Sequence, residues 1–179
     1  MCAQEAHTQL GLDRVTLIPT RIPPHKPVPD EPGPDVRLAL CRAAAADDGR
    51  FDVSALELER EGPSWTVDTL AAVHEQAPED ELIFIAGGDM ARSLPSWRDP
   101  RRILELARFA VAERGGVARA HLREQLAPLG SADRLAFFDM PRIDVSSSDV
   151  RRRMREGRPI RYLVPDPVRQ EIETRRLYR

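Results

Sequence analysis

The chain has 179 residues, of which 27 are basic and 29 are acidic, so its formal net charge is −2. This balance argues against a nucleic-acid-binding domain, which usually carries a clear positive excess, and any anion site must therefore be local. No apolar run approaches the roughly 20 residues needed to cross a bilayer. We expect one domain over residues 1–179, located in the cytoplasm, with a C-terminal helical part from about 146 to 179.

Cysteine and histidine usage gives no sign of a structural metal or a disulfide. Cys2 and Cys41 lack the spacing of a CxxC or zinc motif, which favours free thiols in a reducing compartment. The four histidines are scattered, without an HExxH pattern. We therefore expect no protein-ligated metal.

The predicted elements alternate between helices and strands. Helical spacing over residues 2–10 ends at Gly11, a favourable residue just past a helix. Strands are expected at 15–19, 51–59, 82–86, 108–113 and 135–140. Further helices are expected from Asp35, from Pro63 or Ser64, from Asp99 with Pro100 in the first turn, and at 120–126, 147–155 and 165–177. This order predicts an α/β fold with a mostly parallel sheet and helices on both faces.

The stretch VSSSDVRRRM, residues 145–154, poses the sharpest choice. A single serine suffices to cap a helix, by accepting a hydrogen bond from an early backbone N–H group. Three serines at a helix start, with Arg151 one turn in, also supply the donors and the positive potential that an anion needs. Taken alone, the stretch is equally consistent with a plain cap and with a phosphate site.

Three other places could carry a ligand. The GGDM sequence follows an apolar strand, and its Asp89 could accept from a sugar or could simply cap a helix. The indole of Trp97 could stack on an aromatic ligand, although such a side chain is more often buried in the core. His25 and Lys26 lie in the proline-rich segment 20–34 and could close over phosphates or stay solvated.

Taken together and in order, these pieces resemble bacterial nicotinic acid mononucleotide adenylyltransferases, members of the Rossmann-like nucleotidyltransferases. The resemblance is carried by LGLDRVTLIPTRIPPHK, EREGPSWTVDTL, FIAGGDMARSLPSW, DVSSSDVRRRMREG and IRYLVPDPVRQEIETRRLY, and it runs from Cys2 to Tyr178. It implies transfer of the adenylyl group of ATP, accompanied by Mg²⁺, to nicotinic acid mononucleotide. The products would be deamido-NAD and pyrophosphate.

The resemblance also implies residue roles. Ser147, Ser148 and Arg151 would bind the ATP phosphates, and Lys26 with His25 would close on phosphates from the loop. The nicotinate half would be lined by Thr66, Asp89 and Trp97. Backbone N–H groups near Thr66 and the Trp97 turn would read the carboxylate, since an amide offers donors where acceptors are wanted.

One expected signature of the family does not occur in this sequence. The family begins with a strand and a G-x-F-x-P-x-H-x-G-H motif, whose histidines bind ATP phosphates, whereas Met1 aligns inside the helix after it. That strand lies near the centre of the family's sheet, so we expect two unpaired strand edges here. We expect a longer protein to contain the motif, and the given chain to be less active than a form extended upstream.

Two alternatives remain open on sequence grounds. The acceptor could be another phosphate compound, such as nicotinamide mononucleotide or phosphopantetheine. The chain could also be a non-catalytic nucleotide-binding remnant that kept the acceptor half of the site. Binding to nucleic acid through the arginine cluster is disfavoured by the net charge.

Overall fold

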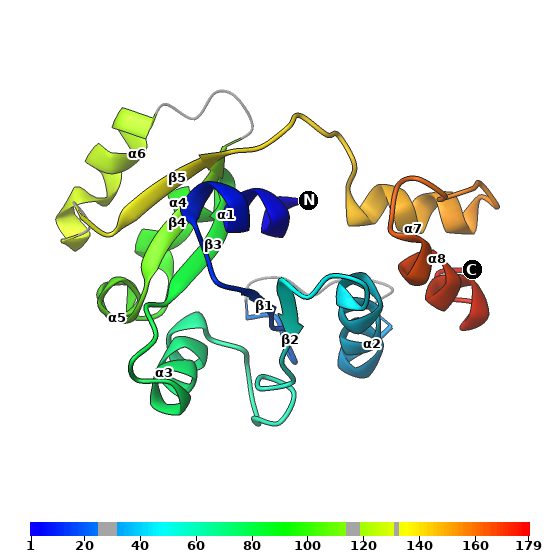
Figure 1. Ribbon diagram of the computed structural model, residues 1–179, viewed down its shortest axis with the longest axis horizontal. Coiled ribbons are helices and arrows are strands. Elements are labelled where there is room, and N and C mark those ends of the chain that lie inside the picture. Colours follow the sequence, from blue (N-terminus) through cyan, green and yellow to red (C-terminus); the bar gives the residue numbers. More distant parts are fainter. Residues whose placement is uncertain (25–31, 114–118, 131–132) are drawn as a thin grey trace. The chain divides into compact units, whose positions relative to one another are not determined.

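The structure is a computed structural model that describes residues 1–24, 32–113, 119–130 and 133–179. Within those ranges, helices and strands alternate along the chain (Figure 1). The strands are β1 (Val15–Leu17), β2 (Phe51–Val53), β3 (Ile83–Gly87), β4 (Arg108–Glu113) and β5 (Leu135–Asp139). The α-helices are α1 (Cys2–Leu10), α2 (Pro34–Ala45), α3 (Thr66–Gln76), α4 (Gly88–Ser93), α5 (Pro100–Leu106), α6 (Arg119–Leu126), α7 (Ser147–Arg155) and α8 (Asp166–Thr174). Short 3₁₀ turns, η1 (Leu94–Ser96) and η2 (Ala127–Leu129), follow α4 and α6.

The chain forms two compact units. Unit 1 contains Met1–Asp13 and Trp65–Arg142, and unit 2 contains Arg14–Ser64 and Ile143–Arg179. The C-terminal helices α7 and α8 therefore belong to the same unit as β1, β2 and α2. The single domain expected over residues 1–179 stays a prediction.

Unit 1 is built on a three-stranded parallel sheet in the order β3-β4-β5. Alternate residues of the strands point to opposite faces, because a strand has a side-chain period of two. One face carries small residues such as Ala110 and Ala136 and packs against Ala6 of α1. The other carries Phe109 and Val111 and packs against helices α3 to α6. Helices on both faces of a parallel sheet are thus confirmed for this unit.

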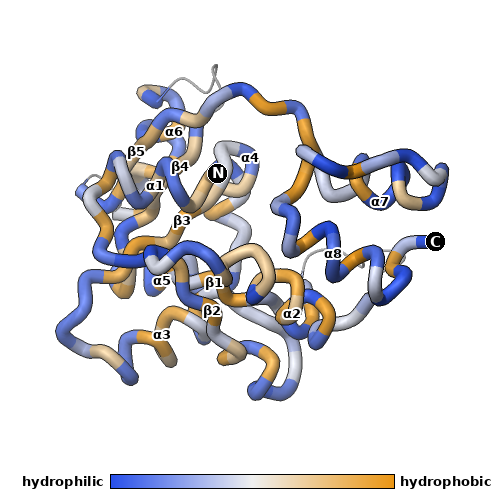
Figure 2. The backbone as a smooth tube through the Cα atoms, turned by 45° about the vertical axis from the view of Figure 1, so that its right-hand side comes forward, coloured by the Kyte–Doolittle hydropathy of each residue, from blue (hydrophilic) through white to orange (hydrophobic). Residues whose placement is uncertain are grey.

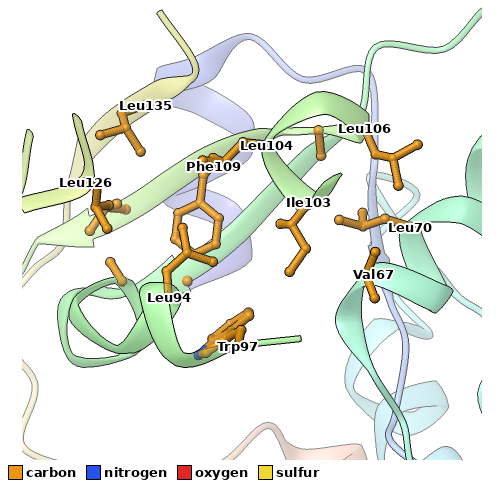
Figure 3. Close-up of a cluster of buried hydrophobic side chains, with 14 of the residues drawn as sticks. Val67, Leu70, Leu94, Trp97, Ile103, Leu104, Leu106, Phe109, Leu126 and Leu135 are labelled. Atoms are coloured by element: carbon orange, nitrogen blue, oxygen red, sulfur yellow. The ribbon is translucent and has the colours of Figure 1, made fainter. Parts of the chain in front are cut away.

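The larger core of unit 1 lies on the second face of its sheet (Figure 3). Phe109 of β4 is fully buried at its centre, and α5 contributes Ile103 and Leu104. Asp99 caps α5 by accepting a hydrogen bond from the Arg102 N–H group, and Pro100 occupies the first turn, as predicted. This core fixes the segment from β3 to α5, which carries two of the candidate site residues.

Unit 2 combines a two-stranded parallel sheet with a small helical core. β1 pairs with β2 in the register Val15 to Phe51. The apolar residues Val168 and Ile172 are four positions apart in α8 and so lie on one face, which packs with Val150 of α7. Figure 2 shows the corresponding alternation of hydrophobic and hydrophilic residues along α8. This core holds the start of α7.

The strands differ from the expectation in their grouping and in one length. They form two sheets rather than one, with the strand orders β1-β2 and β3-β4-β5 among the described residues. The strand predicted over 51–59 ends at Val53. The reason is local, because the Ala55 carbonyl accepts hydrogen bonds from the N–H groups of Leu58 and Glu59 and turns the chain.

Two predicted helix starts were wrong by one to three residues. α2 begins at Pro34 after Gly33, whose φ of 94° suits glycine, and Asp35 lies in its first turn instead of capping it. α3 begins at Thr66 rather than at Pro63 or Ser64. Ser64 is engaged elsewhere, since its hydroxyl accepts from the Arg21 N–H group at 2.9 Å and its own N–H group donates to the Ile22 carbonyl.

Candidate functional site

The three serines Ser146, Ser147 and Ser148 have different roles, because one caps α7 and the other two carry exposed hydroxyls. Ser146 is the N-cap residue of α7, and its side chain accepts from the Asp149 N–H group at 3.1 Å. Ser147 and Ser148 occupy the first two helical positions and are exposed. The Ser148 hydroxyl accepts from the Arg151 guanidinium at 3.3 Å. One serine therefore does the capping, and two remain on the surface where a ligand could reach them.

The arginines of α7 are not equivalent. Arg152 and Arg153 both donate to Asp149, and these hydrogen bonds, chiefly that of Arg152, hold the pKa of the Asp149 carboxyl below its usual value. Arg151 instead points to Ser148. Its charge lies at the start of the helix, where the helix dipole is also positive. The local field at this helix start therefore favours an anion.

A pocket of about 270 Å³ adjoins the start of α7 within unit 2. Its polar wall includes Ser147, Arg151 and Tyr178, and its remaining wall is largely apolar. The apolar lining residues are Leu40, Val145, Val150, Leu163, Val164 and Ile172. Burial raises the pKa of the Tyr178 phenol, against the opposing effect of Arg151 and Arg37, so this hydroxyl stays protonated and can donate. The pocket can therefore accept a ligand that has both an apolar portion and an anionic group.

Trp97 is a core residue of unit 1. Its side chain is only 7% exposed and meets Phe84 and Phe109 edge-on, with ring centroids 5.9 and 6.0 Å away. Figure 3 shows Trp97 beside Phe109 in this core. The indole N–H group donates to the Ser93 hydroxyl at 2.9 Å. The packing interpretation weighed from the sequence is therefore confirmed. Stacking of the indole on a ligand ring stays a prediction.

Thr66 is the first residue of α3 and is half-buried. The preceding residue, Trp65, makes no side-chain cap, and the first intrahelical bond runs from the Thr69 N–H group to the Trp65 carbonyl. Helix geometry gives the N–H groups of the first turn no acceptor within the helix. The N–H groups of this turn therefore need acceptors from outside the helix, and their binding to a carboxylate stays a prediction.

Asp89 lies in the first turn of α4, directly beyond the carboxyl end of β3. Its side chain is 92% exposed and forms an ion pair with Arg92. The N-cap of α4 is Gly87, so the capping alternative for Asp89 is wrong. A Cβ atom added at Gly87 would meet no atom within 4 Å, so open space lies above this strand end. A ligand could approach the backbone here, at the edge where α/β folds bind ligands.

Arg98 is a residue that the sequence reasoning missed. Its guanidinium donates to the Asp68 carboxylate at 3.2 Å and lies 5.7 Å from the centre of the Trp65 ring. It thereby links the Trp97 turn to the first turn of α3. Its position next to Trp97 was the available signal, but only the fold shows which helix the side chain reaches.

The predicted site residues fall into groups. Unit 1 holds Thr66, Asp89 and Trp97, and unit 2 holds Ser147, Ser148 and Arg151, whereas His25 and Lys26 lie outside the described residues. In the ranges that the structure covers, no cluster of three His, Cys, Asp or Glu side chains could hold a metal ion. No helix in those ranges is long and apolar enough to span a membrane.

Comparisons with known proteins give a consistent result. Residues 1–153 match the cytidylyltransferase-like family. A protein of Roseiflexus castenholzii that carries the name "Probable nicotinate-nucleotide adenylyltransferase" is 45% identical over 179 residues, which cover 99% of this chain and 88% of the relative. A Thermus thermophilus protein of the same name is 39% identical, with 100% and 90% of the two chains covered.

Among solved structures, the fold is similar to that of Plasmodium falciparum nicotinic acid mononucleotide adenylyltransferase complexed with NaAD. The TM-score is 0.76, and the match covers 98% of this chain and 87% of the other. The sequences are 15% identical, so this likeness concerns the fold. It agrees with the predicted Rossmann-like nucleotidyltransferase architecture.

Proposed function

Because this chain belongs to the nicotinate-nucleotide adenylyltransferase family, within the cytidylyltransferase-like proteins, we propose that it transfers the adenylyl group of ATP to nicotinic acid mononucleotide. The products are deamido-NAD and pyrophosphate, a step of NAD biosynthesis in the cytoplasm. The observation that carries this proposal is the 45% identity to a relative so named, over 99% of this chain. The motifs that carry the site fall inside that match.

The reaction needs no nucleophile from the protein. A phosphate oxygen of the mononucleotide forms a bond to the α-phosphorus of ATP, while the bond from that phosphorus to the bridging oxygen of the β-phosphate breaks. Pyrophosphate leaves with that oxygen. The protein's task is to hold two anions in line and to stabilise the charge that develops.

The start of α7 is suited to the phosphate part of this task. The hydroxyls of Ser147 and Ser148 are exposed at the helix start, and Arg151 donates toward Ser148. Donors preorganised at a helix N-terminus stabilise phosphate oxygens without reorienting during the reaction. His25 and Lys26 are proposed to bind phosphates from the proline-rich loop. Mg²⁺ enters with ATP as part of the substrate and offsets charge on its phosphates.

The nicotinate half of the substrate is proposed to lie in unit 1. Backbone N–H groups at the start of α3 and at the Trp97 turn would donate hydrogen bonds to its carboxylate, and Asp89 would accept a hydrogen bond from a hydroxyl of the ribose. The buried indole of Trp97 holds its turn in place, and its edge would border the pyridine ring. The open space above Gly87 leaves room for the nucleotide.

Turnover with separate acceptors tests the proposal. Pyrophosphate release is measured with ATP and Mg²⁺ and with nicotinic acid mononucleotide, nicotinamide mononucleotide or phosphopantetheine as acceptor, and the product is identified by mass spectrometry. We expect deamido-NAD and the highest kcat/KM with the acid mononucleotide. A higher kcat/KM with nicotinamide mononucleotide or phosphopantetheine would show that this compound, and not the acid mononucleotide, is the preferred acceptor. Binding of the mononucleotide by folded protein without any turnover would support the non-catalytic alternative.

A further inference from the structure

Arg98 joins the two segments of unit 1 that we assign to the nicotinate carboxylate. These are the turn at Trp97 and the first turn of α3, and the hydrogen bond from Arg98 to Asp68 joins them across 30 positions of the chain. The bond measures 3.2 Å, and the guanidinium also lies against the Trp65 ring at 5.7 Å. Both contacts of the side chain therefore end on the segment that starts α3.

The base of this side chain is held firmly. The neighbouring indole of Trp97 is buried between Phe84 and Phe109, and the Trp97 N–H group donates to the Leu94 carbonyl at 3.0 Å. The packing of Trp97 therefore restrains the backbone from which the Arg98 side chain extends. A planar cation on such a base, with its ring contact to Trp65, keeps one orientation at a smaller entropy cost than a free surface arginine.

The ion pair itself contributes little to the fold. The side chains of Arg98 and Asp68 are 56% and 39% exposed, and ion pairs of this exposure contribute about 0–1 kcal/mol to stability. A guanidinium has five N–H donors, and the hydrogen bond to Asp68 uses one of its nitrogens. The remaining N–H donors can therefore bind a second acceptor near the start of α3.

Acid and amide substrates differ in the group that such a cation recognises. A carboxylate accepts charge-assisted hydrogen bonds, which are about twice as strong as neutral ones. A carboxamide carries no charge and presents an NH₂ group, which a donor-only guanidinium cannot accept. A guanidinium at this place therefore raises affinity for the acid more than for the amide, whose neutral carbonyl oxygen accepts a weaker hydrogen bond.

We propose that Arg98 is a specificity-determining residue that favours the acid mononucleotide over the amide by placing a positive charge beside the start of α3. This inference rests on the proposed function, because it assigns the nicotinate carboxylate to this region. Arg98 adds a charge-assisted hydrogen bond to those that the backbone N–H groups donate to the carboxylate. Asp68 orients the guanidinium by accepting its hydrogen bond at 3.2 Å.

The experiment compares kcat/KM for nicotinic acid mononucleotide and nicotinamide mononucleotide in wild-type protein, Arg98→Gln and Arg98→Lys. We expect Arg98→Gln to lower kcat/KM for the acid about tenfold, mainly through KM, and to change that for the amide less than twofold. Arg98→Lys, which keeps the charge, should recover part of the acid preference. Arg102→Gln is the matched control, because Arg102 is an exposed arginine on α5 paired with Glu105, and it should leave the ratio unchanged.

The outcomes separate the two proposals. An acid-to-amide ratio in Arg98→Gln equal to that of the wild-type protein overturns the role of Arg98 and leaves the proposed function standing. A wild-type protein that turns over neither mononucleotide overturns the proposed function. Equal losses with both substrates in Arg98→Gln indicate a structural role for Arg98 and also overturn the specificity proposal, and a urea unfolding curve shows whether stability accounts for them.

Discussion

The two regions with candidate ligand residues differ in how their side chains are held. In unit 1, Trp97 is 7% exposed and is part of the main core, so the same side chain that borders the proposed site also stabilises the fold. In unit 2, Ser147 and Ser148 are exposed at a helix start whose cap is made by a different residue, Ser146. Substitution of Trp97 therefore mixes stability with function, whereas substitution of Ser147 or Ser148 can separate the two.

The largest expected effect is on stability and comes from Trp97→Ala. Removing the indole leaves a cavity between Phe84 and Phe109 and deprives Ser93 of its donor, so we expect the free energy of unfolding to fall by about 3–5 kcal/mol. Urea denaturation measures this change. Trp97→Phe keeps an aromatic ring in the core and should lose clearly less. A loss below about 1 kcal/mol for Trp97→Ala would contradict the assignment of the indole to the core.

Arg151→Gln is expected to show the opposite pattern, with a large change in activity and a small one in stability. Arg151 is the arginine of α7 that contacts Ser148 at the helix start, so its loss should lower kcat/KM for ATP about 10–100-fold. The free energy of unfolding should change by less than about 1 kcal/mol.

Arg155→Gln, at the other end of the same helix, is the control for removing one positive charge. It should keep kcat/KM for ATP within about twofold of the wild-type value, because Arg155 lies about 12 Å along the helix axis from Ser147, a distance at which exposed charges are largely screened. Equal losses in the two variants would mean that the whole basic helix, rather than its start, attracts ATP. Unchanged kcat/KM in Arg151→Gln would contradict the phosphate site.

Sequence patterns predicted those features that depend on short-range backbone rules. The end of α1 at Gly11, which has a φ of 63°, and the start of α5 at Asp99 and Pro100 were both predicted correctly. The parallel pairing of the strands also followed from their alternation with helices. Each of these features depends on the residue type at one position or on the order of the elements, and both can be read directly from the sequence.

The features that were missed depend on contacts between distant segments. Ser64 could have begun α3, but its hydroxyl accepts from the Arg21 N–H group, so the helix starts at Thr66. Arg98 reads as an ordinary surface charge until the fold places it beside Asp68. For Trp97 the sequence allowed a core role and a ligand role; the positions of its aromatic neighbours show the core role, and the ligand role stays a prediction.

The smallest expected effect tests the division of labour within the serine run. Ser146→Ala removes the hydroxyl that accepts from the Asp149 N–H group at 3.1 Å and should cost about 1 kcal/mol of stability. Ser146→Asp, which keeps a capping acceptor, should lose only a few tenths of a kcal/mol. Ser147→Ala should leave stability within about 0.5 kcal/mol and should instead raise KM for ATP, because its exposed hydroxyl is proposed to bind phosphate. Urea unfolding and steady-state kinetics on the three variants measure both quantities. Removal of the capping hydroxyl leaves an N–H group of the first turn without its acceptor, so the capping residue should show the larger stability loss. A larger loss in Ser147→Ala than in Ser146→Ala would therefore mean that Ser147, and not Ser146, caps the helix.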